Sequence, residues 1–385
     1  MRLLHTSDWH LGLTLEGMPM LDHQRDAIDF IVRAVQEHEI DAVLISGDIY
    51  DRSLPPIEAV ALFEDGLVAL ARHCTVVVTS GNHDSAVRLG FGSRLFADRV
   101  QLRTSLDRIA DPVTLTDEFG PVHIYGIPYL EPDLVRHKLA AERSHEAVLA
   151  AALAQVKADL QVRESTRSVV MAHAFVVGSA GAARSDSERD IRVGGVDSVG
   201  SHLFDGIDYA ALGHLHGPQE PAHPGHGVVR YSGSPLRYSF SEAGHVKSLT
   251  IVDFGPDGVK SVSVLEVPQP RPMAVITGSL ADLVDPDRHS AHDGSWVKAV
   301  VTDPVRPQHM HARLKGRFDH LVVSLHDPVR GPTDPARPRV SAASDPMDVV
   351  LAFIASAMGR AATPAETTVV REQYEALRRE GTFAR

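Results

Sequence analysis

The chain has 385 residues, 43% of them hydrophobic and 23% charged, which is the balance of a globular protein with room for two or three domains. Its formal net charge of −12 argues against a stand-alone nucleic-acid-binding module, which normally carries a basic surface. No apolar run approaches the roughly 20 residues that span a bilayer, so we expect neither a membrane segment nor a signal peptide. Cys74 is the only cysteine, which excludes a disulfide framework and indicates a cytoplasmic protein.

The first two thirds of the chain alternate short apolar segments with helical patterns, which predicts a layered α/β domain over residues 1–267. Helical spacing of apolar residues predicts helices over 21–38, 57–73 and 143–162. The predicted strands lie in RLLHTSD from Arg2, DAVLISGD from Asp41, TVVVTSGNHD from Thr75, VHIYGIP from Val122, SVVMAHA from Ser168, DYAALGHLH from Asp208, VVRYSGSP from Val228 and KSLTIVDF from Lys247.

The last third of the chain has a different organisation. The segment PQPRP at 268–272 is typical of a linker, and a small domain over 273–339 contains the strand candidates MAVITGS, WVKAVVT and HLVVSL. Two helices are predicted within 345–385, over 346–360 and 364–381. The first carries apolar residues along one side: Met347, Val350, Leu351, Ile354 and Met358. These residues could complete the small domain's core, but their place at the end of the chain favours docking of a partner.

Residue types that bind metals follow five of the predicted strands. They are Asp8, His10, Asp48, Asn82, His173, His214 and His216, together with His83 beside Asn82. The carboxyl ends of strands in an α/β sheet meet at one edge, so we expect these side chains to converge there. A donor set without thiolate suits Mn²⁺, Fe²⁺ or Zn²⁺, and seven ligands exceed what one ion needs. The pattern predicts two ions roughly 3.5–4 Å apart that share one carboxylate.

Each of these motifs has an ordinary structural interpretation when it stands alone. A single His-x-His is more often a surface pair, and GNHD could form a plain turn. Their occurrence in order at five strand ends favours the metal centre. Trp9, between two ligands, could pack in the core or stack on a base, and we favour packing. The polar stretch with Arg184, Arg189 and Arg192 could be a solvated loop or could contact DNA or a partner.

The ordered motifs resemble those of the calcineurin-like metallophosphoesterases. Within that superfamily HTSDWHLG, SGDIYDRSLPP, SGNHDS, YAALGHLH and YSGSPLRYSFSEAGHVKSL are similar to the SbcD-type nuclease subunits of bacteria, relatives of the Mre-type repair nucleases. The resemblance covers about residues 1–254. It implies a four-layer β-sandwich flanked by helices, with a small α+β capping domain over 273–339 and C-terminal helices over 345–385.

The resemblance also implies roles for the candidate residues. Asp8, His10, Asp48 and His216 would hold one metal, and Asp48, Asn82, His173 and His214 the other, with Mn²⁺ as the usual ion. His83 would stabilise the transition state or protonate the leaving oxygen. Asp84 would orient His83 or cap the following helix, and both alternatives stay open. The implied partners are DNA, an SbcC-like ATPase subunit and a second copy of the chain within a heterotetramer.

Three function classes therefore compete. The first is a DNA repair nuclease with double-strand exonuclease and single-strand or hairpin endonuclease activity. The second is a phosphoesterase for small phosphodiesters or phosphoproteins, and the third is a scaffold that keeps the metals for stability alone. The chain has no GxxxxGK[ST] phosphate-binding loop, so ATP dependence would come from the partner. The C-terminal extension favours the first class over the second, and the complete ligand set disfavours the third.

Overall fold

The computed structural model describes residues 1–96, 99–163, 167–178, 183–188, 198–328, 346–358 and 360–379. The chain divides into two compact units. The first combines Met1–Val301 with Gln308–Leu325, and the second combines Thr302–Pro307 with His326–Arg385. Among the described residues, no helix has the length and apolar character needed to cross a membrane.

A six-stranded sheet has the order β15-β14-β1-β4-β5-β6. Its strands are β1 (Arg2–Thr6), β4 (Ala42–Ser46), β5 (Thr75–Thr79), β6 (Val100–Leu102), β14 (Ser248–Gly255) and β15 (Gly258–Glu266). The first four run parallel, while β14 pairs antiparallel with both β1 and β15. Ser46 and Thr79 are cross-strand partners, so β4 and β5 end side by side.

A second sheet has five strands in the order β13-β12-β9-β8-β7. They are β7 (Val113–Asp117), β8 (Gly120–Gly126), β9 (Ser168–His173), β12 (Tyr209–Gly213) and β13 (Val228–Tyr231). All neighbours are parallel except β7 and β8, which form a hairpin. The last residue of β9, His173, pairs with Gly213 at the end of β12, so these two strands also end together.

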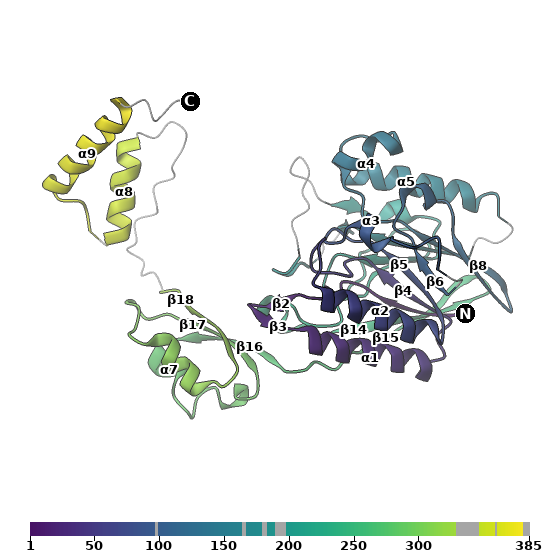
Figure 1. Ribbon diagram of the computed structural model, residues 1–385, viewed down its shortest axis with the longest axis horizontal. Helices are drawn as coiled ribbons and strands as arrows, with labels where there is room; N and C mark the ends of the chain where they lie inside the picture. Colours follow the sequence, from purple (N-terminus) through teal and green to yellow (C-terminus); the bar gives the residue numbers. More distant parts are fainter. Residues whose placement is uncertain are drawn as a thin grey trace. The chain divides into compact units, whose positions relative to one another are not determined.

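The two sheets pack face to face and each carries helices on its outer face (Figure 1). Residues such as Leu44 and Val77 of the first sheet form a buried core with Val169 and Ala211 of the second. A second core lies between the first sheet and helices α1 (Leu21–Glu37) and α2 (Ile57–Ala71). A third lies between the second sheet and helices α4 (Pro132–Leu139) and α5 (His145–Leu160). The expected four-layer α/β sandwich is therefore the observed fold.

Each of the eight predicted segments contains most or all of a strand, and all three predicted helices of this region are present, with helix ends that shift by one or two residues. Strands β6, β7 and β15 were not predicted. Residues of β7 alternate between buried or half-buried and exposed, whereas β15 after its first residue is only half-buried or exposed. The sequences VTLTD and GVKSVSVLE both interleave polar with apolar side chains. Such strands give a weaker apolar signal than the continuous runs of β4 and β5, which are covered on both faces.

The region predicted as a small domain forms its own three-stranded sheet, β16 (Met273–Gly278), β17 (Trp296–Val301) and β18 (Leu321–His326). Helices α6 (Leu280–Leu283) and α7 (Met310–Arg317) cover one face of it and share its core. Helix α7 was not predicted, because MHARLKGR contains few apolar residues. Met273 and Trp296 also pack against Leu15, Met20 and neighbouring residues of the first domain.

Shorter elements complete the first unit. They are β2 (Thr14–Leu15), β3 (Met18–Pro19), α3 (Ala86–Leu89), β10 (Val176–Val177), β11 (Val199–Gly200) and the 3₁₀ turns η1 (Leu106–Arg108), η2 (Ser201–Phe204), η3 (Phe240–Glu242) and η4 (Ser290–His292).

The second unit contains the two predicted C-terminal helices, α8 (Pro346–Met358) and α9 (Pro364–Arg379). They contact each other, and Ile354 of α8 lines an apolar groove with Ala365, Val369 and Val370 of α9. Most of the Pro- and Arg-rich segment that precedes α8 lies outside the described residues.

Candidate metal centre

The seven predicted ligands all lie where strands end. Asp8 and Asp48 follow β1 and β4 by two residues, Asn82 follows β5 by three, and His173 is the last residue of β9. His214 follows β12 directly, and His216 comes two residues later. Asn82 is half-buried and the other six are buried, with at most 3% of each exposed. Ends of three strands of one sheet and two of the other therefore meet at one place.

The backbone at these positions is strained. Asp8, His10, Asp48 and His214 have φ angles of +54°, +44°, +48° and +107°, which non-glycine residues rarely adopt. Each such residue costs on the order of 1–3 kcal/mol, so strain of this kind points to a functional constraint. Hydrogen bonds between the loops hold the geometry: Asp8 N donates to Gly47 O (3.0 Å) and His10 N donates to Asp48 O (3.0 Å).

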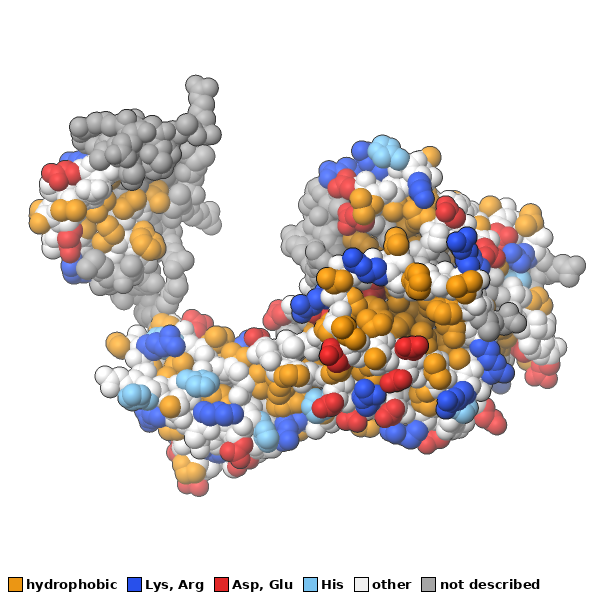
Figure 2. Space-filling view, viewed as in Figure 1, with side chains coloured by type: hydrophobic (Ala, Val, Ile, Leu, Met, Phe, Trp, Pro, Cys, Tyr) orange, Lys and Arg blue, Asp and Glu red, His pale blue; other side chains and the backbone are white. Residues whose placement is uncertain are grey.

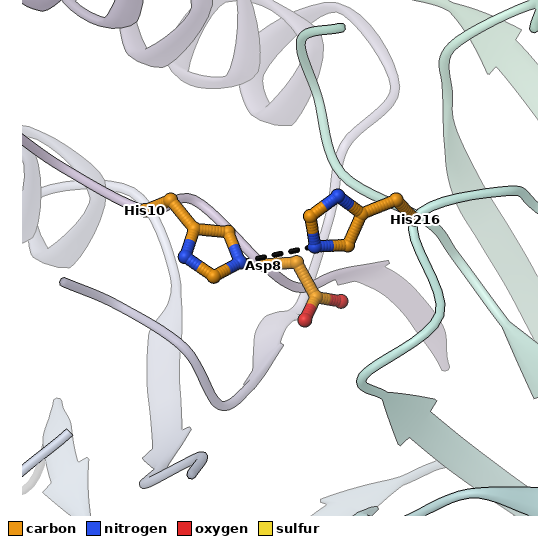
Figure 3. Close-up of side chains that lie close together, drawn as sticks. All are labelled: Asp8, His10 and His216. Atoms are coloured by element: carbon orange, nitrogen blue, oxygen red, sulfur yellow. Dashed lines mark hydrogen bonds between the residues drawn. The ribbon is translucent and has the colours of Figure 1, made fainter. Parts of the chain in front are cut away.

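Asp8, His10 and His216 form one group of potential ligands (Figure 3). The Nε2 atoms of His10 and His216 lie 3.1 Å apart. Asp8 is held by the hydroxyl of Ser7, which donates to Oδ2 at 2.6 Å, and by the backbone N–H of His214, which donates to Oδ1 at 3.0 Å. The side-chain atoms of these three residues thus point toward a common position.

Asn82, His173 and His214 form a second group. Asn82 Oδ1 lies 2.9 Å from His173 Nε2 and 3.2 Å from His214 Nδ1. Asp48 stands between the two groups: its Oδ2 is 3.4 Å from His173 Nε2 and 3.7 Å from His10 Nε2. This is the position that a carboxylate shared between two ions would occupy.

Burial dominates the electrostatics of the centre. Burial raises the pKa of Asp8 and lowers the pKa of His10 and His214 well below the usual histidine range. At His214 the neighbouring His173 lowers the pKa further. For Asp48, burial acts in the raising direction, but His173, His10 and His83 together outweigh it and hold the pKa well below its usual range. At His173, burial lowers the pKa, but Asp48, helped by Asp8 and the Ser46 carbonyl, outweighs burial and raises the pKa to about 9. A cation bound beside Asp48 would replace the proton of His173, so metal binding should release protons.

The donor set fits two divalent cations. Carboxylate, imidazole and amide groups are ligands for Mn²⁺, Fe²⁺ and Zn²⁺, and none of the grouped residues is a thiol. Among the described residues, the buried atoms His10 Nδ1, Asn82 Nδ2 and His214 Nε2 have no hydrogen-bond partner. No Lys or Arg side chain is among the groups that move the pKa of Asp8 or Asp48 most. Bound cations would therefore balance the negative charge of two buried carboxylates, Asp8 and Asp48, whose main charged neighbours are histidines.

His83 lies at the edge of the centre, grouped with His10 and Asp48. Its backbone N–H donates to Asp48 Oδ1 at 2.8 Å, and its ring Nδ1 lies 2.6 Å from the carbonyl oxygen of Asp51. Because a carbonyl oxygen only accepts, Nδ1 carries a proton, and Nε2 is the atom left for a substrate.

The structure corrects the expectation for Asp84. The Asp51 carbonyl, and not Asp84, orients the His83 ring, and Ser85 is the residue that precedes helix α3 as its N-cap. The Asp84 carboxylate instead accepts backbone N–H groups of Ile49 (3.1 Å), Tyr50 (3.0 Å) and Gly81 (2.9 Å). Asp84 therefore ties the loop that carries Asp48 to the loop that carries Asn82 and His83.

Residues that support His216 were missed in the sequence. Ser187 Oγ lies 2.7 Å and Glu242 Oε1 lies 3.2 Å from His216 Nδ1, and Glu188 Oε1 accepts the His216 backbone N–H at 2.8 Å. Lys247 is paired with Glu242. Glu242 and Lys247 belong to the segment SFSEAGHVKSL that carried part of the family resemblance, but nothing in the local pattern shows which histidine they contact.

Other residues that drew attention in the sequence make contacts within the protein. Trp9 is buried and packs edge-to-face against Phe63, as expected. Arg237, which lies within the motif YSGSPLRYSFSEAGHVKSL, donates from its guanidinium to the carbonyl oxygen of His245. Arg184 lies over the ring of Phe175 at 4.6 Å, whereas Arg189 and Arg192 lie outside the described residues.

Three solved structures share a general likeness with the chain. TT1561 of Thermus thermophilus is 12% identical, with a TM-score of 0.43 over 69% of this chain and 99% of that chain. GAP50, the anchor in the inner membrane complex of Plasmodium, is 9% identical, with a TM-score of 0.40 over 86% and 98%. The Thermus thermophilus sulfate thiohydrolase SoxB in complex with glycerol is 13% identical, with a TM-score of 0.30 over 69% and 56%.

A family model gives the stronger result. The model described as calcineurin-like phosphoesterase matches residues 1–218, which is more than half of the chain and includes all seven candidate ligands. On this match the chain belongs to the calcineurin-like phosphoesterase family, which together with the grouped ligand residues supports a metal-dependent hydrolase of phosphate esters.

Proposed function

We propose that the chain is the nuclease subunit of an SbcCD-type DNA repair complex and that it hydrolyses DNA phosphodiesters. The observation that supports this proposal most directly is the position of Asp48 Oδ2, 3.4 Å from His173 Nε2 and 3.7 Å from His10 Nε2. A shared carboxylate between two donor groups is what two-ion phosphodiester hydrolysis requires. The resemblance over about residues 1–254 narrows the proposal from phosphoesterases in general to SbcD-type nucleases.

The chain's own residues would divide the work. Asp8, His10, Asp48 and His216 would hold one cation, and Asp48, Asn82, His173 and His214 the other. Two bound cations would supply Lewis acidity to the phosphate and lower the pKa of a water molecule. His83, with Nδ1 held by the Asp51 carbonyl, would direct Nε2 to the phosphate or give a proton to the leaving oxygen.

The C-terminal helices are the part of the chain that we assign to an SbcC-like ATPase. Phe353 of α8 is 71% exposed and Val369 of α9 is 58% exposed beside the groove that the two helices form. Large apolar side chains that are this exposed to water would be stabilised by a partner protein that covers them.

An exposed apolar patch supports a second copy of the chain as a partner. It consists of side chains around α2 and α3 that are 69–87% exposed: Leu54, Ile57, Val87, Phe91 and Leu95. Hydrophobic side chains gather on this face of the first unit in Figure 2. A homodimer that buries the patch would remove these side chains from water.

The proposal is tested with linear duplex DNA, hairpin DNA and bis(p-nitrophenyl) phosphate in Mn²⁺, each with and without an SbcC-like ATPase. We expect the small diester to be cleaved by the chain alone and duplex degradation to require the ATPase and ATP. A chain truncated after Ala343 should retain diester cleavage and lose both ATPase binding and duplex degradation. Cleavage of small phosphodiesters or phosphoproteins without any action on DNA would support the second function class and overturn the nuclease assignment.

A further inference from the structure

A buried ion pair stands directly behind one of the candidate ligands. Glu242 and Lys247 are both 0% exposed, and Lys247 Nζ lies 2.5 Å from Glu242 Oε2. Lys247 also donates to the backbone carbonyl of His216 and to Ser234 Oγ, each at 2.8 Å. The other oxygen of Glu242, Oε1, faces His216 Nδ1 at 3.2 Å. The pair therefore contacts His216 twice, once through its ring and once through its main chain.

The hydrogen bonds determine which ring nitrogen of His216 carries the proton. An ionised Glu242 can only accept, so the hydroxyl of Ser187 donates its proton to Glu242 Oε1 and offers its lone pairs to His216 Nδ1 at 2.7 Å. Both neighbours of Nδ1 are then acceptors, and Nδ1 must hold the proton. The opposite nitrogen, Nε2, is left with a lone pair that points at Asp8 and His10.

We infer that Glu242, held in place by Lys247, is a positioning residue that fixes the tautomer of His216 and so presents Nε2 to one of the two cations. The inference rests on the two-cation assignment of the proposed function. It concerns only the cation near Asp8 and His10, because neither Glu242 nor Lys247 has a described contact with Asn82, His173 or His214.

Glu242→Gln is the informative substitution because the glutamine amide has one accepting and one donating end. Lys247 has only donors, so the amide oxygen will turn to Lys247 and the NH₂ group to His216. Nδ1 must then accept, and the proton moves to Nε2, which can no longer bind a cation. Replacing Lys247 with Met in the same chain removes this demand, so the amide oxygen can face Nδ1 again.

The experiment is Mn²⁺ titration of the full chain by calorimetry, with ¹⁵N NMR of the His216 ring in the metal-free protein. We expect Glu242→Gln to weaken one of two Mn²⁺ by about 10–100-fold, to leave the other unchanged, and to move the ring proton to Nε2. Glu242→Gln with Lys247→Met should recover the Nδ1 proton and most of the lost affinity. The control is Asp117→Asn, which breaks the partly buried pair with Arg167 away from the centre and should bind both ions normally.

Several outcomes separate the possibilities. Unchanged affinity for both ions and an unchanged tautomer in Glu242→Gln would overturn the inference, as would failure of the second substitution to restore binding. If Glu242→Gln does not fold, Glu242→Leu with Lys247→Met keeps the core apolar and leaves Nδ1 with Ser187 alone. We expect that double variant to bind one of the two Mn²⁺ ions at least about 10-fold more weakly than the wild-type chain. Wild-type affinity for both ions in this variant would also overturn the inference. A wild-type chain that binds fewer than two Mn²⁺ would instead count against the proposed function.

Discussion

Gly81 is the residue whose substitution the structure predicts most sharply. A Cβ atom added at Gly81 would lie 2.1 Å from Asp48 Oδ1 and 2.4 Å from Asp48 N. Asp48 Oδ1 already accepts the His83 backbone N–H at 2.8 Å, so a movement of this oxygen would also disturb that hydrogen bond. Gly81→Ala therefore pushes directly on the carboxylate that stands between the two ligand groups.

The size of the effect follows from the distances. Real Cβ atoms essentially never approach another heavy atom closer than 3.0 Å, so the carboxylate or the Gly81 loop must move by about 0.9 Å (3.0 minus 2.1). Overpacking of this kind costs about 1–3 kcal/mol of stability. A misplacement of about 1 Å at a reacting centre costs on the order of 10²-fold in rate. We expect Gly81→Ala to remain folded and to lose at least that factor in kcat on bis(p-nitrophenyl) phosphate.

The assay combines steady-state kinetics in Mn²⁺ with thermal unfolding. The matched control is Gly316→Ala in α7, where an added Cβ meets nothing within 4 Å. Replacing an exposed helical glycine should stabilise the protein by up to about 1 kcal/mol and leave kcat unchanged. A Gly81→Ala protein with kcat within twofold of wild type would refute the placement of Asp48 at the reacting centre.

Three further substitutions test the centre and its surroundings. His83→Ala should keep both Mn²⁺ ions in calorimetry and lower kcat by roughly 10²–10⁴-fold; loss of an ion would make His83 a ligand. Asp48→Ala should abolish tight binding of both ions, whereas loss of only one would refute the shared position. Asp117→Asn should lower the free energy of unfolding by about 2–4 kcal/mol at pH 7 by breaking the pair with Arg167, which holds the pKa of Asp117 below its usual range. The pair stabilises above the unfolded-state pKa, so the difference between wild type and variant should shrink as the pH falls below about 4 in denaturant titrations.

Buried parallel strands made much of the fold predictable from the sequence. Segments such as AVLIS and TVVVT are covered on both faces, so their apolar runs are continuous and their ends are marked by SGD and SGNHD. The residue pattern alone could not show that β1, β4 and β5 belong to one sheet while β9 and β12 belong to another. That division depends on long-range pairing such as His173 with Gly213, which leaves no local signal.

The convergence of the candidate ligands was predictable for the same reason, because each lies at the end of an apolar strand or within four residues of it. The groups that support them were not predictable. Asp84 is three residues from Gly81 but reaches Ile49 and Tyr50, more than 30 positions away, and Glu242 lies 26 positions from His216. A carboxylate that accepts backbone N–H groups from a distant loop looks the same in sequence as one that caps a helix. Only the folded chain distinguishes these roles.

The loops around the centre are held by the protein itself. Asp84 accepts three backbone N–H groups across two loops, and the strained residues Asp8, His10 and Asp48 are cross-linked by the main-chain bonds of Asp8 to Gly47 and of His10 to Asp48. Strain of about 1–3 kcal/mol per residue persists only where surrounding contacts over-determine the backbone. The bonds made by Asp84 and by the main chain use none of the side-chain atoms that would bind a metal. The carboxylates of Asp8 and Asp48 are held in addition by backbone N–H groups, which donate to them. The two sheets and their loops therefore hold the donor groups in place before any cation binds. Cation binding then does not have to order the site, so less of its free energy is lost.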